Sequence, residues 1–201
     1  MATLLRNSVV PNIGISPTTV ISTTTNNRYT IIGLNLANTT TSMVQVNIQM
    51  VDSDTYASHT ISNVEITGIA GNFTCDATKL QVGQSVTISG TAGGTGSITG
   101  YSNPTTYYII STDGVSAFQL SATNGGPAIT TTAGIPTGLT YTVGTIEVVA
   151  YMLKNIMVAP QSSLKAMTNG EKIVMGPSNS LRIFANANSA IDAVVSFVEI
   201  L

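Results

Sequence analysis

The sequence contains little charge. Asp, Glu, Lys and Arg make up 8% of its 201 residues, whereas about 25% is usual for a globular protein. Assembly hides surface that charge would otherwise keep solvated, so this composition favours a subunit of a large assembly over a free monomer. A secreted, threonine-rich β protein is the alternative. The seven Lys and Arg residues are scattered and the net charge is −2, which speaks against nucleic-acid binding because phosphates require a basic stripe.

Cysteine, histidine and long apolar runs are equally scarce. The single Cys75 excludes an intramolecular disulfide framework and agrees with folding in a reducing compartment such as bacterial cytoplasm. The single His59 excludes a two-histidine metal site, and no Gly-x-Ser-x-Gly motif supports a Ser-His-Asp relay. The longest apolar run, residues 148–153, is far shorter than the roughly 20 residues of a membrane helix. We therefore expect no membrane insertion, and the first residues show no targeting segment.

Four features that resemble reactive sites have simpler explanations. Cys75 has no base beside it in sequence and is expected to be an inert, buried thiol, and His59 is expected in a surface loop. Asp52 and Asp54 lack the remainder of a calcium loop, so we expect them to end a strand, with Asp54 bonding to local backbone. The glycine-rich residues 93–100 lack the Lys-Ser/Thr ending of a phosphate loop and predict a flexible hairpin tip. No catalytic residue, metal site or cofactor is predicted, and the chain is not expected to be an enzyme.

β-Branched residues and turn formers dominate what the sequence does contain. Residues 43–50 alternate strictly, with Val44, Val46 and Ile48 on one face and Gln45 and Gln49 on the other. This period of two indicates an antiparallel strand with one buried side. Similar strands separated by turns recur every eight to twelve residues, which predicts a β-sandwich. A C-terminal helix over residues 187–195 is the less favoured alternative to a strand there.

The middle of the chain differs from its flanks. Residues 64–145 carry only four charged side chains but have a strand rhythm and turns of their own. The flanks, residues 1–63 and 146–201, are interpreted as two halves of one framework. The predicted fold is therefore all-β, with a β-sandwich or jelly-roll-like framework and a small inserted β domain. An insertion at a loop tip projects outward, where binding and variation are tolerated.

Aromatic residues concentrate in this inserted segment. Tyr101, Tyr107 and Tyr108 lie there together with Phe118 and Tyr141. The favoured interpretation is that they form the small core of the insert. The alternative is that Tyr101, Tyr107 and Tyr108 are exposed and stack on sugar rings or other host surface groups.

The inserted segment resembles a module that recurs in structural proteins of marine tailed phages, notably cyanophages. The residues that carry the resemblance are GQSVTISGTAGGTGSITGY at 83–101, NPTTYYII at 103–110 and AITTTAGIPTGLTY at 128–141. The framework resembles small virion β proteins of tailed phages through TLLRNSVVP at 3–11, GEKIVM at 170–175 and VSFVEIL at 195–201. Neither resemblance brings catalytic residues.

These resemblances imply a non-enzymatic virion protein, assembled in the cytoplasm of the bacterial host. We expect it on the tail, neck or baseplate, with the insert projecting outward. Decoration of the capsid shell is one alternative, and a receptor- or glycan-binding adhesin module is another. The expected partners are other virion proteins and further copies of the chain, with a trimer as one arrangement and a host surface glycan as a ligand in the adhesin alternative. A hydrolase would require His59 beside a nucleophile.

Overall fold

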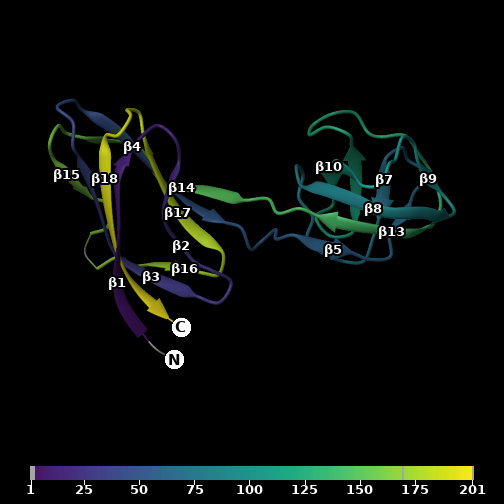
Figure 1. Ribbon diagram of the computed structural model, residues 1–201, viewed down its shortest axis with the longest axis horizontal. Coiled ribbons are helices and arrows are strands. Elements are labelled where there is room, and N and C mark those ends of the chain that lie inside the picture. The colour runs from purple at the N-terminus through teal and green to yellow at the C-terminus, as the bar shows by residue number, and fades with distance from the viewer. Residues whose placement is uncertain (1–2, 169, 201) are drawn as a thin grey trace. The chain divides into compact units, whose positions relative to one another are not determined.

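The computed structural model describes residues 3–168 and 170–200. All regular elements in these ranges are β-strands, which confirms the all-β prediction. The chain forms two compact units (Figure 1): the framework, up to Asp54 and from Val148 onward, and the insert, Thr55–Glu147. The insert begins earlier than residue 64 because β5 (His59–Ile61) pairs with a strand of the insert and not with the framework.

The framework contains two antiparallel sheets. The first sheet has the order β1, β18, β3, β15, and β16 also pairs with β3. Its strands are β1 (Thr3–Ile13), β18 (Ile191–Ile200), β3 (Arg28–Asn38), β15 (Ser163–Lys165) and β16 (Ile173–Met175). The second sheet has the order β14, β4, β17, β2. Its strands are β14 (Val148–Val158), β4 (Val44–Asp52), β17 (Asn179–Ala185) and β2 (Thr18–Ser22).

This strand order is that of a double-sheet jelly roll. Because β15 and β16 both pair with β3, they share one place in the first sheet. Consecutive strands of the framework then alternate between the two sheets except at β4 and β14, which flank the insert and pair with each other in the second sheet. The chain enters the insert after β4 and returns at β14, where Asp52 pairs with Val148. The insert therefore occupies the β4–β14 connection of the jelly roll.

The framework core lies between its two sheets. In β4 the predicted burial of Val44, Val46 and Ile48 is confirmed. The strict alternation is not, because Asn47 is also buried and Val51 is buried where Met50 was expected. The C-terminal segment is a strand and not a helix. Its inward residues Val195 and Phe197 pack in the same core.

The insert is a curled seven-stranded antiparallel sheet with its own core (Figure 1). Its strand order is β5, β13, β8, β10, β11, β7, β6, and a two-stranded sheet of β12 and β9 lies beside it. Phe73 and Phe118, which face each other across β7 and β11, stack with ring centroids 5.4 Å apart. The strands are β6 (Glu65–Ile66), β7 (Asn72–Thr74), β8 (Ser85–Gly94), β9 (Ser97–Ile98), β10 (Thr105–Thr112), β11 (Ala117–Ser121), β12 (Thr131–Thr132) and β13 (Pro136–Val143).

Glycines allow two backbones to approach closely between β8 and β13. Gly90 has a φ of +108° and lies beside a bulge in the pairing, where a Cβ would collide with the carbonyl oxygen of Gly138. Gly94 still pairs, with Pro136, so the glycine-rich segment is largely strand. The flexible tip predicted for residues 93–100 shrinks to the short turn between β8 and β9. These glycines therefore serve strand pairing rather than phosphate binding.

Substitution of Gly90 by alanine should weaken the insert. The strained φ alone is expected to lower the free energy of unfolding by about 1–3 kcal/mol, and the collision with the Gly138 backbone adds to this effect. Urea unfolding of the full chain would measure the loss. Gly114→Ala is the matched control, because Gly114 also has a positive φ, of +85°, but open space around it. An equal loss in both variants would show that close backbone approach contributes nothing.

Candidate interaction surfaces

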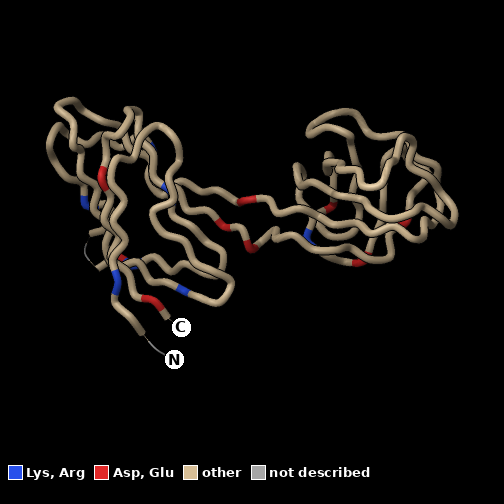
Figure 2. The backbone as a smooth tube through the Cα atoms, in the orientation of Figure 1, with Lys and Arg blue, Asp and Glu red and all other residues tan. Residues whose placement is uncertain are grey.

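The ionisable side chains are dispersed rather than gathered into a reaction centre (Figure 2). Within residues 3–168 and 170–200, His, Cys, Asp and Glu form no group of three or more that could hold a metal ion. Asp52 ends β4 as expected, but it is the Asp52 carboxylate that bonds to local backbone, accepting from the Asp54 amide at 2.8 Å. Asp54 was expected to bond to local backbone through its side chain, whereas in this bond Asp52 supplies the side chain and Asp54 the backbone amide.

His59 lies in a strand and not in the predicted connecting loop. It is half-buried in β5, with Nδ1 3.0 Å from the carbonyl oxygen of Ala57 and Nε2 2.8 Å from Thr78 Oγ1. The neighbouring Ser58 hydroxyl donates to the carbonyl oxygen of Val143 at 2.7 Å. Both side chains therefore make contacts at the edge of the insert, the Ser58 hydroxyl with backbone and the His59 ring with backbone and with Thr78.

Cys75 is half-buried in the insert. Burial, followed by the charges of Asp76 and Asp113, raises the pKa of the thiol to about 11. The thiolate is the nucleophilic form of cysteine, so this shift lowers the reactivity of the side chain at neutral pH.

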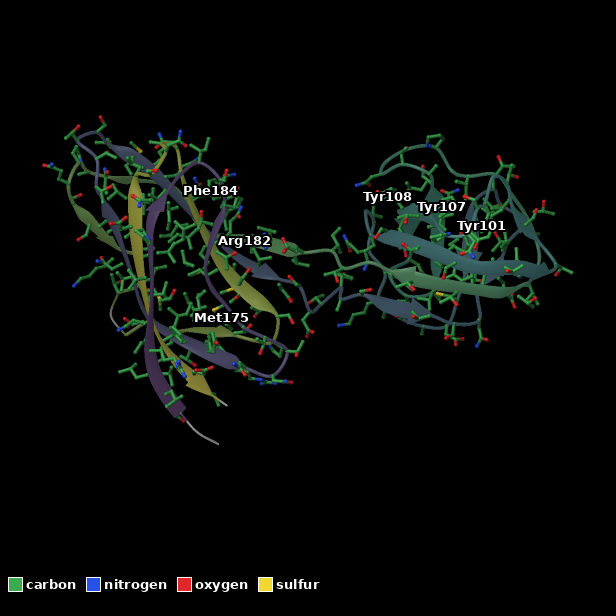
Figure 3. The ribbon with its side chains drawn as sticks, viewed as in Figure 1. Tyr101, Tyr107, Tyr108, Met175, Arg182 and Phe184 are labelled. Carbon is green, nitrogen blue, oxygen red and sulfur yellow. The ribbon has the colours of Figure 1, made fainter. Side chains whose placement is uncertain are left out.

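The three tyrosines singled out from sequence do not form one exposed platform (Figure 3). Tyr107 is only 3% exposed and belongs to the core of the insert, so its prediction as a surface-binding residue is wrong. Successive residues of a strand point to opposite faces, which places the half-buried Tyr108 on the other side of β10. The half-buried Tyr101 donates its hydroxyl to the carbonyl oxygen of Gly90 at 2.7 Å.

Tyr141 extends the buried aromatic group. Among the described residues, none forms a hydrogen bond with its hydroxyl. Burial, and then the nearby Tyr101 and Tyr107, raise the pKa of this hydroxyl to about 12. Tyr141 also contacts Phe73 edge-on, with ring centroids 6.4 Å apart. These aromatic side chains therefore act mainly as core.

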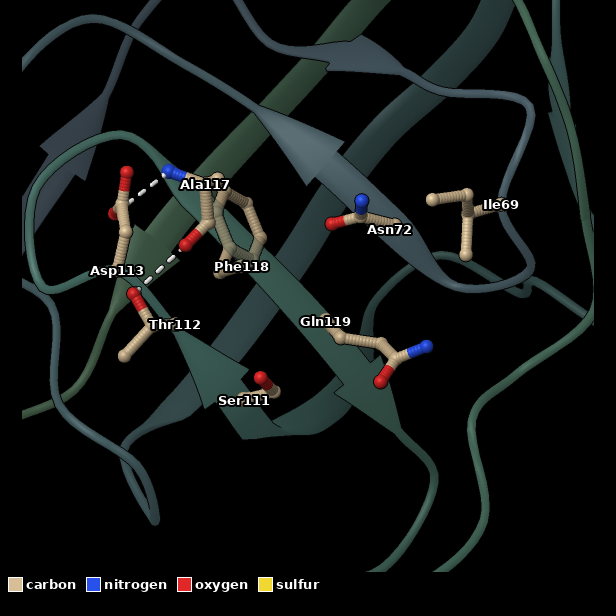
Figure 4. A pocket seen from close by; sticks show the side chains of 8 residues that line it. All are labelled: Ile69, Asn72, Ser111, Thr112, Asp113, Ala117, Phe118 and Gln119. Carbon is tan, nitrogen blue, oxygen red and sulfur yellow. Dashed lines mark hydrogen bonds between the residues drawn. The ribbon is translucent and has the colours of Figure 1, made fainter.

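A shallow hollow of about 270 Å³ lies beside the turn between β10 and β11 (Figure 4). Asp113 borders it, and its Oδ1 accepts hydrogen bonds from the backbone amides of Val115, Ser116 and Ala117 at 2.8–3.0 Å. These bonds, that from Ala117 first, hold the pKa of the carboxyl well below its usual range. The charge of Asp113 therefore holds the turn rather than serving a ligand.

Asp113→Asn should destabilise this turn at neutral pH but much less in acid. A carboxyl whose pKa is depressed by folding stabilises the protein above its unfolded pKa of about 3.9 and loses this effect as pH falls toward the folded value. Hydrogen exchange of β10 and β11 in both proteins would show a difference at neutral pH that shrinks in strong acid. Glu65→Gln, at an exposed position of the insert, is the control. A difference independent of pH would contradict the role given to the charge.

A larger groove of about 590 Å³ runs along the insert beside β5, β6 and β13. Its lining mixes polar and apolar groups, including Glu65, Thr137 and the exposed Ile135. A volume of this size is in the range of ligand sites, which are mostly about 300–1,000 Å³.

The outward face of the first framework sheet exposes several large apolar side chains. One cross-strand row consists of Leu5, Val198, Thr30 and Val174, which lie opposite one another on β1, β18, β3 and β16. Leu5 is 73% and Val174 72% exposed. We call this surface the outer face.

A second row of the outer face pairs Val9 with Val194, and the latter also lies opposite Asn35. Val9 is 66% exposed. Between the two rows lies a polar row, in which Ser196 is opposite Asn7 on one side and Gly33 on the other. The outer face therefore alternates ridges and a shallow groove, and the exposed Ile32 adds to its apolar surface.

Charged groups are turned away from the centre of the outer face. Arg6 lies opposite Phe197, on the inward side of β1, and its Nε is 2.7 Å from Oε2 of the buried Glu199. Asn27 donates to the other carboxylate oxygen of Glu199 at 3.0 Å. Three charged residues lie on the outward side but at its margins: Arg28 at the start of β3, Lys165 on a border strand and Asp192 near the start of β18.

The second framework sheet presents a different surface. Tyr151 and Phe184 contact each other edge-on, with centroids 6.4 Å apart, and Lys154 Nζ lies 4.9 Å from the Tyr151 ring centroid. Arg182 and Gln49 lie opposite each other in the same sheet, and Arg182 and Phe184, both labelled in Figure 3, are two residues apart on β17. This mixed polar and aromatic surface is already engaged internally, because Lys154 covers one side of Tyr151.

Sequence reasoning did not find the outer face, because it did not predict β1. The signal was weak: Asn7, Ser8 and Pro11 interrupt the apolar residues of this segment. A border strand tolerates such residues, since proline needs no ladder partner there. Leu5 and Val9, four residues apart, were the available indication of a shared face.

Neither a protein-family model, nor a curated protein, nor a solved structure matches the chain. The described residues contain no helix with the length and apolarity needed to cross a bilayer.

Proposed function

We propose that the chain is a non-enzymatic structural protein of a tailed-phage virion, attached to the tail, neck or baseplate. Its framework makes the permanent contacts with the particle, and the insert extends from an interstrand loop. The exposed, uncharged centre of the outer face is the observation that carries this proposal. Surfaces of this kind suit permanent contacts, because charged residues are depleted at the centres of protein interfaces.

Two further observations support a virion role. The double-sheet jelly roll recurs in viral capsid domains, although a fold by itself does not determine function. The resemblance of residues 83–110 and of the framework segments to phage structural proteins points in the same direction. Affinity in such a protein comes from many weak contacts multiplied by multivalency, so no reactive site is needed.

Protein identification in purified particles tests this proposal. Particles are isolated from lysates of the cells that naturally produce the chain, washed with salt, and separated into heads and tails. The proposal predicts that the chain remains with the tails. Recovery with the heads would support the capsid-decoration alternative, and absence from the particles would contradict virion membership.

Glycan binding by the insert is the second candidate function. The groove beside β5, β6 and β13 favours it, in place of the tyrosines named from sequence. An array of host surface glycans probed with the full chain should then show binding that Thr137→Arg, within the groove, abolishes. Val149→Arg, on the framework, should leave that binding unchanged. Silence across diverse host glycans would remove this candidate.

A further inference from the structure

We propose that the outer face is occupied by a second copy of this chain, in a face-to-face homotypic contact. The contact would pack the first sheet of one framework on the first sheet of the other. This inference deepens the proposed function by naming the partner of the outer face. Only the place of the contact, between copies of the chain on a virion, rests on the proposed function.

The dimensions of the face fit a stable dimer. With β1 of 11 residues, a rise of about 3.3 Å per residue and a strand spacing of about 4.8 Å give a face of about 35 by 19 Å across four strands. Two such faces together cover about 1,300 Å², which exceeds the roughly 1,000 Å² expected of a specific interface. A smaller occupant would leave part of the exposed apolar surface in water.

The relief of the face is self-complementary. The Val9–Val194 row forms a ridge, and the adjacent row with Ser196 and Gly33 forms a groove. Neighbouring rows on one face lie about 7 Å apart along the strands. Ridges and grooves of two such faces can interdigitate, as side chains of packed sheets do. A two-fold contact of this kind uses the same patch on both subunits.

Charge does not oppose the contact. The centre of the face is free of the Arg6 charge, which pairs with Glu199 on the inward side of the sheet. Arg28, Lys165 and Asp192 stay at the margins, where an interface remains hydrated. The face can thus be buried against its copy without desolvating a charge at its centre.

Sedimentation velocity of the full chain over a hundredfold range of concentration tests this inference. The wild-type chain should dimerise, and Val194→Lys should raise the dissociation constant by at least about 100-fold, because like charges would meet across the contact. Leu5→Lys should also raise the dissociation constant. Because Leu5 is 73% exposed on a border strand, this substitution should not disturb folding. Melting curves check that both variants are folded.

Two matched controls locate the contact. Val149→Lys places the same charge on the second sheet, and Val82→Lys places it on the insert, at positions that are 45% and 48% exposed. Both variants should associate like wild type. A monomeric wild type, or a dimer that Val149→Lys disrupts and Val194→Lys spares, would overturn the inference. Such a result would leave the virion proposal standing, which particle composition tests separately.

Discussion

Phe73→Ala should lower the free energy of unfolding of the insert by about 4 kcal/mol, the usual effect of removing a buried phenylalanine. Phe73 has no exposed surface, stacks on Phe118 and contacts Tyr141. A domain of this size is typically stable by about 5–15 kcal/mol, so the variant insert would be marginal. The framework should keep its stability, because its core is separate.

Native-state hydrogen exchange resolves the two units in one experiment. Phe73→Ala should reduce protection in β8, β10 and β11 by up to about a thousandfold, at 1.4 kcal/mol per factor of ten. Phe197→Ala, in the framework core, is the reciprocal control and should affect β3, β4 and β18 instead. Equal loss of protection in both units from either variant would show that the chain unfolds as one cooperative body.

Asn38→Ala should destabilise the framework by about 3 kcal/mol, since each buried polar group left unpaired costs about 1–3 kcal/mol. Asn38 is 2% exposed, and its Nδ2 donates to the carbonyl oxygens of Ser42, Val158 and Ala159 at 2.8–3.1 Å. Its Oδ1 accepts from the Thr40 amide at 2.9 Å. One amide thereby joins the β3–β4 connection to the end of β14.

Urea unfolding measures this effect. Asn35→Ala is the matched control, because Asn35 lies on the same strand but is exposed, and its substitution should change stability by less than about 0.5 kcal/mol. Asn38→Asp retains an acceptor for Thr40 but removes the donors, so it should be as harmful as alanine. Full stability of Asn38→Asp would show that the three carbonyl contacts are unimportant.

Much of the framework was predictable because its strands are amphipathic. Val44, Val46 and Ile48 in β4 alternate with polar residues, and only a strand with one buried face explains this period. The C-terminal strand was favoured for the same reason, through Val195 and Phe197. Pairing between distant strands, which makes the jelly roll, was beyond local patterns, since register depends on contacts across the whole framework.

The insert was recognised, but its boundaries and surface were not. Its start was placed at residue 64 because the stretch with little charge begins there. In the structure β5, which precedes residue 64, belongs to the insert sheet through its pairing with β13. Composition could not tell which of the adjacent Tyr107 and Tyr108 is buried, because that depends on the direction of curl of the sheet. Residues 93–100 were interpreted as a flexible hairpin tip, although Gly94 pairs with Pro136 at a close backbone approach that needs glycine just as much.

The central claim is that this chain is held on a virion through its framework, and imaging of labelled particles tests it most directly. Val82→Cys, in a chain whose native thiol is removed by Cys75→Ser, introduces an exposed thiol on the insert for a gold label. The account predicts gold at defined positions on the tail, neck or baseplate of purified particles. Particles without gold, with all label in the soluble fraction, would contradict it.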